Sequence, residues 1–162
     1  MNWIRKLLLW VIVISLITTT SGCGTKTFST NQINSIEKEK ISLIAINKGS
    51  SQQEEYTDSD MISEIIHNLN KVKVKKSSRD EDIRILDSGN ALKKNSTIII
   101  HLLNDENELQ SMAILLSENE LYLPDVKSMQ GSTYTASYIN DSDDITLKSI
   151  NAIYSLAKKP TK

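Results

Sequence analysis

Cys23 stands out first for its chemistry, because it is the only cysteine in the 162-residue chain. A thiolate is a strong nucleophile and the form in which cysteine reacts. A lone thiol has no disulfide partner within its own chain, so its presence calls for another use. Two small residues, Ser21 and Gly22, precede it and leave the backbone accessible to an enzyme. The sequence therefore indicates covalent modification at Cys23.

The segment before Cys23 has the parts of an export signal. Arg5 and Lys6 form a basic start, an apolar run covers residues 7–17, and small polar residues complete the segment. The run is short for a membrane-spanning helix, which needs ~20 apolar residues. We therefore expect residues 1–22 to be a signal peptide whose basic end stays on the cytoplasmic side.

The stretch Thr20-Ser21-Gly22-Cys23 resembles a bacterial lipobox. The resemblance implies that Cys23 takes a diacylglycerol, that signal peptidase II cleaves between Gly22 and Cys23, and that the new amino group can take an acyl chain such as palmitate. Thr20 departs from the motif, which usually has an aliphatic residue there. Because two chains anchor a protein stably, the expected location is the extracytoplasmic face of the cell membrane. The alternatives are an uncleaved signal-anchor helix, or ordinary signal-peptide cleavage that leaves Cys23 an idle thiol.

Histidines offer little further chemistry. The chain has two, His67 and His101, and no motif that would pair either with a serine nucleophile. His67 falls off the apolar stripe of an expected helix, so we expect it to face solvent. His101 lies in an aliphatic strand, where we expect it on the polar face of a sheet or paired in the core. We predict no catalytic residue, no cofactor and no metal.

Two acidic clusters have simple structural interpretations. Asp141, Asp143 and Asp144 are hard oxygen ligands of the kind that calcium prefers. The EF-hand pattern fails, however, because its glycine and its final glutamate are missing. We therefore expect these carboxylates to cap a helix N-terminus. The run 80–82, Asp-Glu-Asp, is expected to be a solvated loop.

The charge balance excludes one class of partner. The formal net charge is −1, and it becomes more acidic once Arg5 and Lys6 are removed. General nucleic-acid binding needs a concentrated basic surface, so no nucleic acid is expected. The one basic cluster covers residues 71–76. Its favoured interpretation is a solvated helix end, and the alternative is contact with anionic lipid headgroups or cell-wall polymer.

Two amphipathic helices are expected to position these residues. The first covers 58–71, with a capping box from Thr57 to Asp60. Its apolar stripe consists of Met61, Ile62, Ile65, Ile66 and Leu69. The second opens at 140–144 and stops at Pro160. Its stripe consists of Ile145, Ile150, Ile153, Tyr154 and Ala157.

The remaining patterns predict strands and therefore an α+β fold. The expected strands are 41–46, 96–103, 109–116, 121–123 and 132–139. Residues 52–56 are expected to be a polar connection, and 75–94 a loop with a possible short edge strand at 83–86. Because short turns join successive strands, we expect an antiparallel β-meander of about four to five strands with both helices packed on one face. The expected organisation is a signal peptide at 1–22, lipidated Cys23 and a flexible polar tether at 23–40, and one domain at 41–162.

This organisation resembles the small exported lipoproteins of Bacillus-type, Gram-positive bacteria, most closely in the stretch from Leu121-Tyr122-Leu123-Pro124-Asp125 through Ser137-Tyr138-Ile139. Their functions are largely unknown, so the resemblance implies a location and an architecture without an activity. Together with the missing catalytic motifs, it leads us to expect a non-enzymatic binding module that holds an envelope protein, peptide or polymer. A small envelope hydrolase that uses carboxylates and a structural accessory of an envelope or spore complex are the alternatives. A binding module predicts an exposed tyrosine patch, at Tyr134 and Tyr138 if the helices leave that face open.

Overall fold

The computed structural model of the chain describes residues 26–27, 38–49, 53–87, 90–124, 126 and 137–158. The strands in this part are β1 (Lys26–Thr27), β2 (Leu43–Lys48), β3 (Glu54–Tyr56), β4 (Lys73–Lys76), β5 (Ile98–Leu103), β6 (Leu109–Ser117), β7 (Glu120–Pro124) and β8 (Ser137–Asn140). The main helices are α3 (Ser59–Leu69) and α6 (Asp144–Lys158), and the single turns are η1 (Lys38–Lys40, 3-10), α4 (Arg79–Asp82) and η2 (Ile83–Asp87, π-helical). The fold is therefore α+β, as expected.

All strand pairs are antiparallel, and they form one sheet in the order β1-β4-β8-β7-β6-β5-β2-β3. The centre of the sheet is the predicted meander, β5 to β8, in which each strand pairs with the next. Short turns join β5 to β6 and β6 to β7. The prediction of four to five strands was too low. The two-residue strand β1, together with β3 and β4, extends the meander at its edges, and β2 joins it beside β5.

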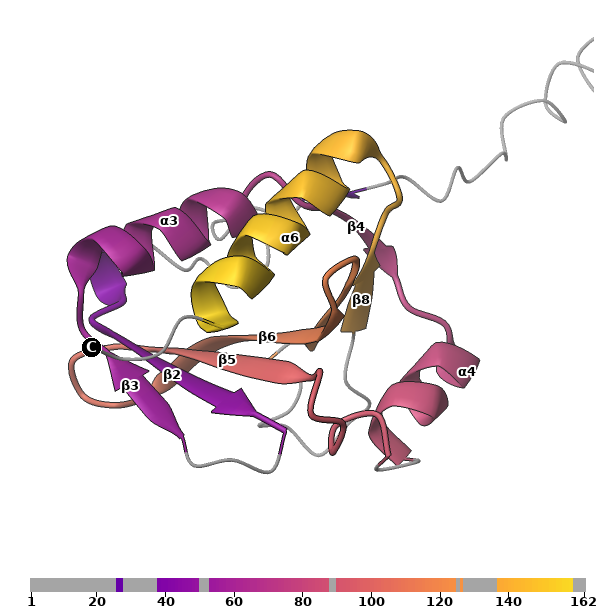
Figure 1. The fold of residues 1–162 in the computed structure, drawn as a ribbon, viewed down its shortest axis with the longest axis horizontal. Coiled ribbons are helices and arrows are strands. Elements are labelled where there is room, and N and C mark those ends of the chain that lie inside the picture. Colours follow the sequence, from indigo (N-terminus) through magenta and orange to yellow (C-terminus); the bar gives the residue numbers. More distant parts are fainter. Residues whose placement is uncertain are drawn as a thin grey trace, which may run out of the picture.

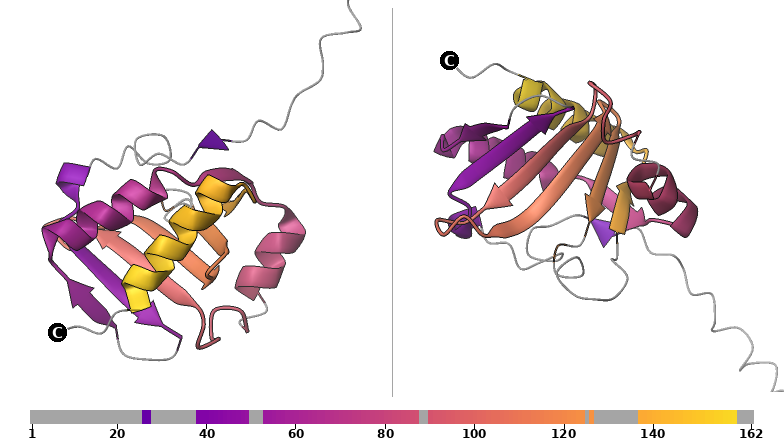
Figure 2. Two further views of the ribbon diagram at one scale, coloured as in Figure 1. Left: turned by 45° about the horizontal axis from the view of Figure 1, so that its top comes forward. Right: turned by 90° about the horizontal axis from the view of Figure 1, so that it is seen from below.

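Helices α3 and α6 lie side by side on one face of the sheet, as predicted (Figures 1 and 2). The main core lies between them and the strands. Its fully buried members include Ile44, Ile100 and Leu115 from the sheet, and Ile65 and Ile153 from the helices. Helix α3 also carries the chain from β3, at one edge of the sheet, to β4 near the other edge. This crossing explains why the N-terminal strands lie on both sides of the meander.

The ends of the two helices differ from the prediction in detail. Asp58, and not Thr57, is the N-cap of α3, and its carboxylate accepts a hydrogen bond from the Met61 N–H at 2.7 Å. On α6, Ile145 is 58% exposed and does not belong to the buried stripe. Thr146, one residue later, is buried in its place. A shift of one residue rotates a helix position by about 100°, so the stripe begins one residue later than expected.

The opposite face of the sheet carries a second, smaller core. Its buried members are Ile85, Ile114, Leu116 and Tyr122. Ile85 comes from η2, so α4 and η2 place an apolar side chain on this face. The prediction of a loop with an edge strand in this region was wrong. Ser78 and Glu81 form a reciprocal capping box that starts α4, a pattern that the polar composition of the segment concealed.

The basic cluster at 71–76 is largely a strand, so its interpretation as a helix end was wrong. Val72 and Val74 are fully buried, whereas Lys71, Lys73, Lys75 and Lys76 are exposed. Residues 71–75 alternate with a period of two, which is the period of a half-buried strand. Lys76 is exposed although it lies on the same face as Val74. The polar connection expected at 52–56 likewise contains β3, which pairs with β2.

Several predictions concern residues outside the described part. They include the signal peptide, Gly22, Cys23 and Tyr134, together with most of the expected tether. Within the tether, Lys26–Thr27 pair with β4, and Lys38–Lys40 form a 3-10 turn. No helix in the described ranges has the length and apolar character needed to cross a membrane.

Candidate functional site

The most concentrated polar cluster in the described structure centres on the carboxylate of Asp82. Its Oδ1 atom accepts hydrogen bonds from Tyr122 Oη at 3.0 Å and from Ser137 Oγ at 2.7 Å. Ser77 Oγ donates to the same oxygen. The four residues come from the β4–α4 connection, the end of α4, β7 and β8. The sheet and α4 therefore meet at a single carboxylate oxygen.

The local sequence explains why Asp82 reaches this position. The capping box of Ser78 and Glu81 fixes the start of α4, with a hydrogen bond from the Ser78 N–H to Glu81 at 2.7 Å. The same bond is the main reason why the pKa of Glu81 is lowered. Asp82 then ends the turn, and Ile85 packs into the second core three residues later. The prediction that residues 80–82 form a solvated loop is therefore wrong for Asp82, which is only 9% exposed.

The cluster around Asp82 is closed to solvent. Ser77, Tyr122 and Ser137 are 8%, 0% and 2% exposed, so a substrate would have little access to any of the hydroxyls. Three hydroxyl donors satisfy a buried carboxylate oxygen well, and hydrogen bonds to a charged acceptor are the stronger kind. The geometry thus suits a structural clamp between α4 and the sheet better than it suits catalysis.

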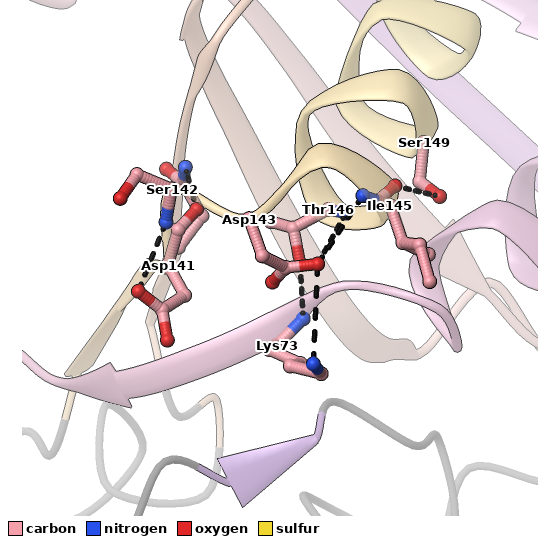
Figure 3. A network of polar contacts seen from close by, with 8 residues as sticks. Lys73, Asp141, Ser142, Asp143, Ile145, Thr146 and Ser149 are labelled. Atoms are coloured by element: carbon pink, nitrogen blue, oxygen red, sulfur yellow. Dashed lines mark hydrogen bonds and ion pairs between the residues drawn. The ribbon is translucent and has the colours of Figure 1, made fainter.

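The second acidic cluster forms the start of α6 (Figure 3). Asp143 Oδ1 accepts hydrogen bonds from the N–H groups of Ile145 and Thr146, both at 3.2 Å, and its Oδ2 accepts one from Thr146 Oγ1 at 2.7 Å. The Thr146 hydroxyl is the main reason why the pKa of Asp143 is lowered. The predicted helix cap is confirmed.

The same cluster joins α6 to β4. The Lys73 N–H donates to Thr146 Oγ1 at 3.0 Å, and the Asp141 N–H donates to the Lys73 carbonyl at 2.8 Å. Lys73 Nζ also lies 3.9 Å from Asp143 Oδ1 (Figure 3). The start of α6 is therefore fixed to the strand that carries the exposed lysines. Across the described ranges, no group of three or more His, Cys, Asp or Glu side chains could hold a metal ion.

The two histidines lie in different environments. His67 is exposed on α3, as predicted. His101 is half-buried on β5, between Ala45 of β2 and Met112 of β6, and burial lowers its pKa. This face of the sheet is opposite the helices, because the alternate β5 residues Ile100 and Leu102 face the main core.

An open groove of about 490 Å³ lies at the N-terminal end of α3. Two largely buried isoleucines, Ile41 and Ile62, contribute to its lining. Its other lining residues are Lys38, Glu39, Ser42, Thr57, Ser59, Asp60 and Ser63. An apolar floor surrounded by hydroxyl and charged groups suits a polar, extended ligand such as a peptide or polymer segment. No pattern in the sequence predicts this groove, because its lining comes from η1, the residues just before β2, and the start of α3.

Of the two residues of the expected tyrosine patch, only Tyr138 lies in the described part of the chain. Tyr138 is half-buried and packs against the main core under the helices. The condition for an exposed patch at this residue, a face left open by the helices, is therefore not met. Tyr134, like Cys23 and Gly22, lies outside the described residues.

Comparison of the chain with protein-family models, curated proteins and solved structures finds no match. The expected relation to exported lipoproteins therefore remains a prediction that depends on the residues around Cys23.

Proposed function

We propose that this protein is a lipid-anchored interaction module at the extracytoplasmic face of the cell membrane. Cys23 carries the diacylglycerol, and the folded domain holds an envelope protein, peptide or polymer without transforming it. The observation that carries the proposal is the position of the only cysteine. It directly follows a basic and apolar signal segment and two small residues, where the lipid-modifying enzymes would act.

The uses of the acidic side chains support a binding role. Asp82 is buried beneath three hydroxyl donors, and Asp143 is engaged by two backbone N–H groups and a threonine. A hydrolase that acts through carboxylates needs two of them exposed to the substrate at a suitable separation. Structural roles account for these two carboxylates, and this favours a module that binds.

The open groove at the start of α3 is the surface that we assign to the partner. Its hydroxyl groups and its charges, from Lys38, Glu39 and Asp60, can form hydrogen bonds with a polar chain. The buried isoleucines beneath offer a small apolar contact. In Figures 1 and 2 this end of α3 lies away from the junction of β4 and α6.

Anchoring is tested by replacing Cys23 with Ala and labelling cells with a palmitate analogue. We expect label on the wild-type protein and none on the variant, because Cys23 supplies both the thiol and the new N-terminus. Equal labelling of the two proteins would refute lipidation.

Partner binding is tested by placing a photoreactive amino acid at Ser63 in the groove and crosslinking in the native envelope. The matched control has the same amino acid at Lys93, which is exposed but does not line the groove. We expect one dominant adduct from position 63 and none from position 93. Equal adducts at both positions would refute the assignment of the groove. Cleavage of the captured partner by the wild type, but not by Glu39→Gln, would indicate an enzyme instead.

A further inference from the structure

Strand β1 brings the chain that follows Cys23 to one particular edge of the sheet. Lys26 pairs with Val74 and Thr27 pairs with Lys73, so β1 lies directly beside β4. Lys26 is three residues after Cys23. Three residues span at most about 11 Å, whatever their conformation. An acyl chain on Cys23 would therefore enter the membrane close to β4, and the domain would be held much nearer the membrane than a free tether to residue 40 would allow.

The edge beside β1 is basic. Lys71, Lys75 and Lys76 are exposed, and the Lys73 side chain retains 45% of its exposure. Two carboxylates act on these lysines: Asp143 lies 3.9 Å from Lys73, and Lys75 helps to lower the pKa of Glu81. Lys71 and Lys76 make no ion pair with any residue that the structure describes.

An exposed apolar side chain lies next to these lysines. Ile145, in the first turn of α6, is 58% exposed, the highest value for a large apolar residue in the described structure. Its neighbour Thr146 accepts the hydrogen bond from the Lys73 N–H, which fixes this turn of the helix against β4 (Figure 3). Exposed apolar groups among lysines are the combination that binds at a membrane interface.

We propose that Lys71, Lys73, Lys75 and Lys76, together with Ile145, line this edge of the sheet from both of its faces, and that the edge contacts anionic lipid headgroups. We call this set the β4 surface. The inference rests on the proposed lipidation of Cys23, and it adds an orientation: the β4 surface faces the membrane, and the groove at the start of α3 faces away from it.

The strength of the contact follows from the charges. A lysine near an anionic membrane contributes roughly a fivefold change in binding, and Asp141, Asp143 and Asp144 at the same end of α6 reduce the total. The β4 surface alone would bind weakly. The anchor at Cys23 lies within about 11 Å of Lys26 in β1, and β4 is the next strand, so that each encounter of the β4 surface with the headgroups is effectively intramolecular. The expected result is a docked domain that salt releases without detaching the lipid.

The test uses the full chain, processed and lipidated in cells, and reconstituted into vesicles of phosphatidylcholine with or without phosphatidylglycerol. Once Cys23 is acylated, a single introduced cysteine is the only thiol to label. A fluorophore is placed at Ser142→Cys beside β4, or at Glu106→Cys in the β5–β6 turn at the far end of the fold (Figure 1). A quencher in the lipid headgroups then reports which end lies at the membrane.

We expect strong quenching at position 142, weak quenching at position 106, and loss of the difference without phosphatidylglycerol. The double variant Lys75→Gln/Lys76→Gln should lower the docked-to-free ratio by up to roughly 25-fold, because each lysine contributes about fivefold. The matched variant Lys93→Gln/Lys94→Gln removes the same charge from exposed positions elsewhere and should leave the ratio unchanged.

Two results would overturn the inference while leaving the lipid anchor intact. One is equal quenching at the two positions in a protein that carries the palmitate label. The other is weak quenching at position 142 on phosphatidylglycerol vesicles, together with binding of purified anionic wall polymer by the wild type but not by Lys75→Gln/Lys76→Gln, which would make the polymer the ligand. If the wild-type protein takes up no palmitate label, the proposed anchoring itself fails, and this outcome is separate from both.

Discussion

Replacing Asp82 tests whether the buried cluster clamps α4 to the sheet. The variant Asp82→Ala removes one acceptor that Ser77, Tyr122 and Ser137 share. Each of these hydroxyls is buried, so water cannot easily replace the carboxylate. We therefore expect a large loss of stability, spread over α4, η2 and the second core.

The size of the loss can be worked from the contacts. A buried donor that loses its partner costs about 1–3 kcal/mol. The two serines can partly re-pair, because their Oγ atoms are already 3.4 Å apart. We therefore expect Asp82→Ala to lower the free energy of unfolding by roughly 2–5 kcal/mol. Asp82→Asn keeps an acceptor oxygen without the charge, so it should cost about half as much. Tyr122→Phe removes one donor and should cost about 1 kcal/mol.

The assay is urea unfolding followed by circular dichroism, because both tryptophans, Trp3 and Trp10, lie in the expected signal peptide. The control is Asp80→Asn, an exposed carboxylate in the same turn, and it should change stability by less than about 0.5 kcal/mol. The double variant Asp82→Ala/Tyr122→Phe should lose less stability than the two single variants lose in total, because the two residues share a hydrogen bond. A loss for Asp82→Ala as small as that of the control would refute the clamp.

Three further perturbations test other parts of the fold. Gly49 has φ +57°, and a Cβ there would lie 3.0 Å from Asn95 Cα. Gly49→Ala should therefore cost at least about 1 kcal/mol in urea unfolding, and an unchanged midpoint would contradict this. Burial lowers the pKa of His101, so the unfolded chain binds its proton more readily and stability should fall as the pH drops below about 6.5. His101→Gln should remove that slope in a pH series, and an identical slope would assign it elsewhere. Two hydrogen bonds lower the pKa of Glu54, and the bond from Lys48 has a larger effect than the bond from Tyr56. Its stabilising effect should be present above the unfolded pKa near 4.5 and be lost as the pH falls through the lower folded value. Glu54→Gln should flatten this acid limb in thermal melts, whereas the exposed neighbour Glu55→Gln should not, and equal effects of the two would count against the bond.

The parts of the fold that sequence predicts well are those with long, regular patterns. Helix α3 follows from isoleucines at helical spacing, strand β5 follows from a run of isoleucines, and strand β6 follows from an aliphatic segment joined to β5 by a polar turn. These patterns arise from burial on one face, which leaves a periodic record in the sequence. The helix cap at Asp143 also follows, because a short acidic side chain just before a helix has a local partner.

The parts that sequence misses depend on contacts between distant residues. In the sequence, Asp82 is one of three consecutive acidic residues that predict a solvated loop. Its hydrogen-bond donors Tyr122 and Ser137 lie 40 and 55 residues further along the chain. The groove at the start of α3 is also not predictable from a local pattern, because it needs η1, the residues just before β2, and the helix together. Strand β4 was mispredicted for a different reason. Val72 and Val74 alternate with lysines, as in a half-buried strand, but the charge of the four lysines favours a solvated helix end.

The structure of β4 also decides whether its lysines can act as one surface. Buried Val74 holds the strand against the main core, and the two backbone bonds of Lys73 tie it to the start of α6. The lysine backbones and Ile145 are therefore fixed relative to one another before any membrane is met. A preordered surface loses less conformational entropy on contact than a flexible basic tail does. It follows that replacing the exposed lysines with glutamine should leave the unfolding midpoint nearly unchanged, whereas Val74→Ala should lower it. A combination of these substitutions can thus separate the charge of the β4 surface from the integrity of the strand that presents it.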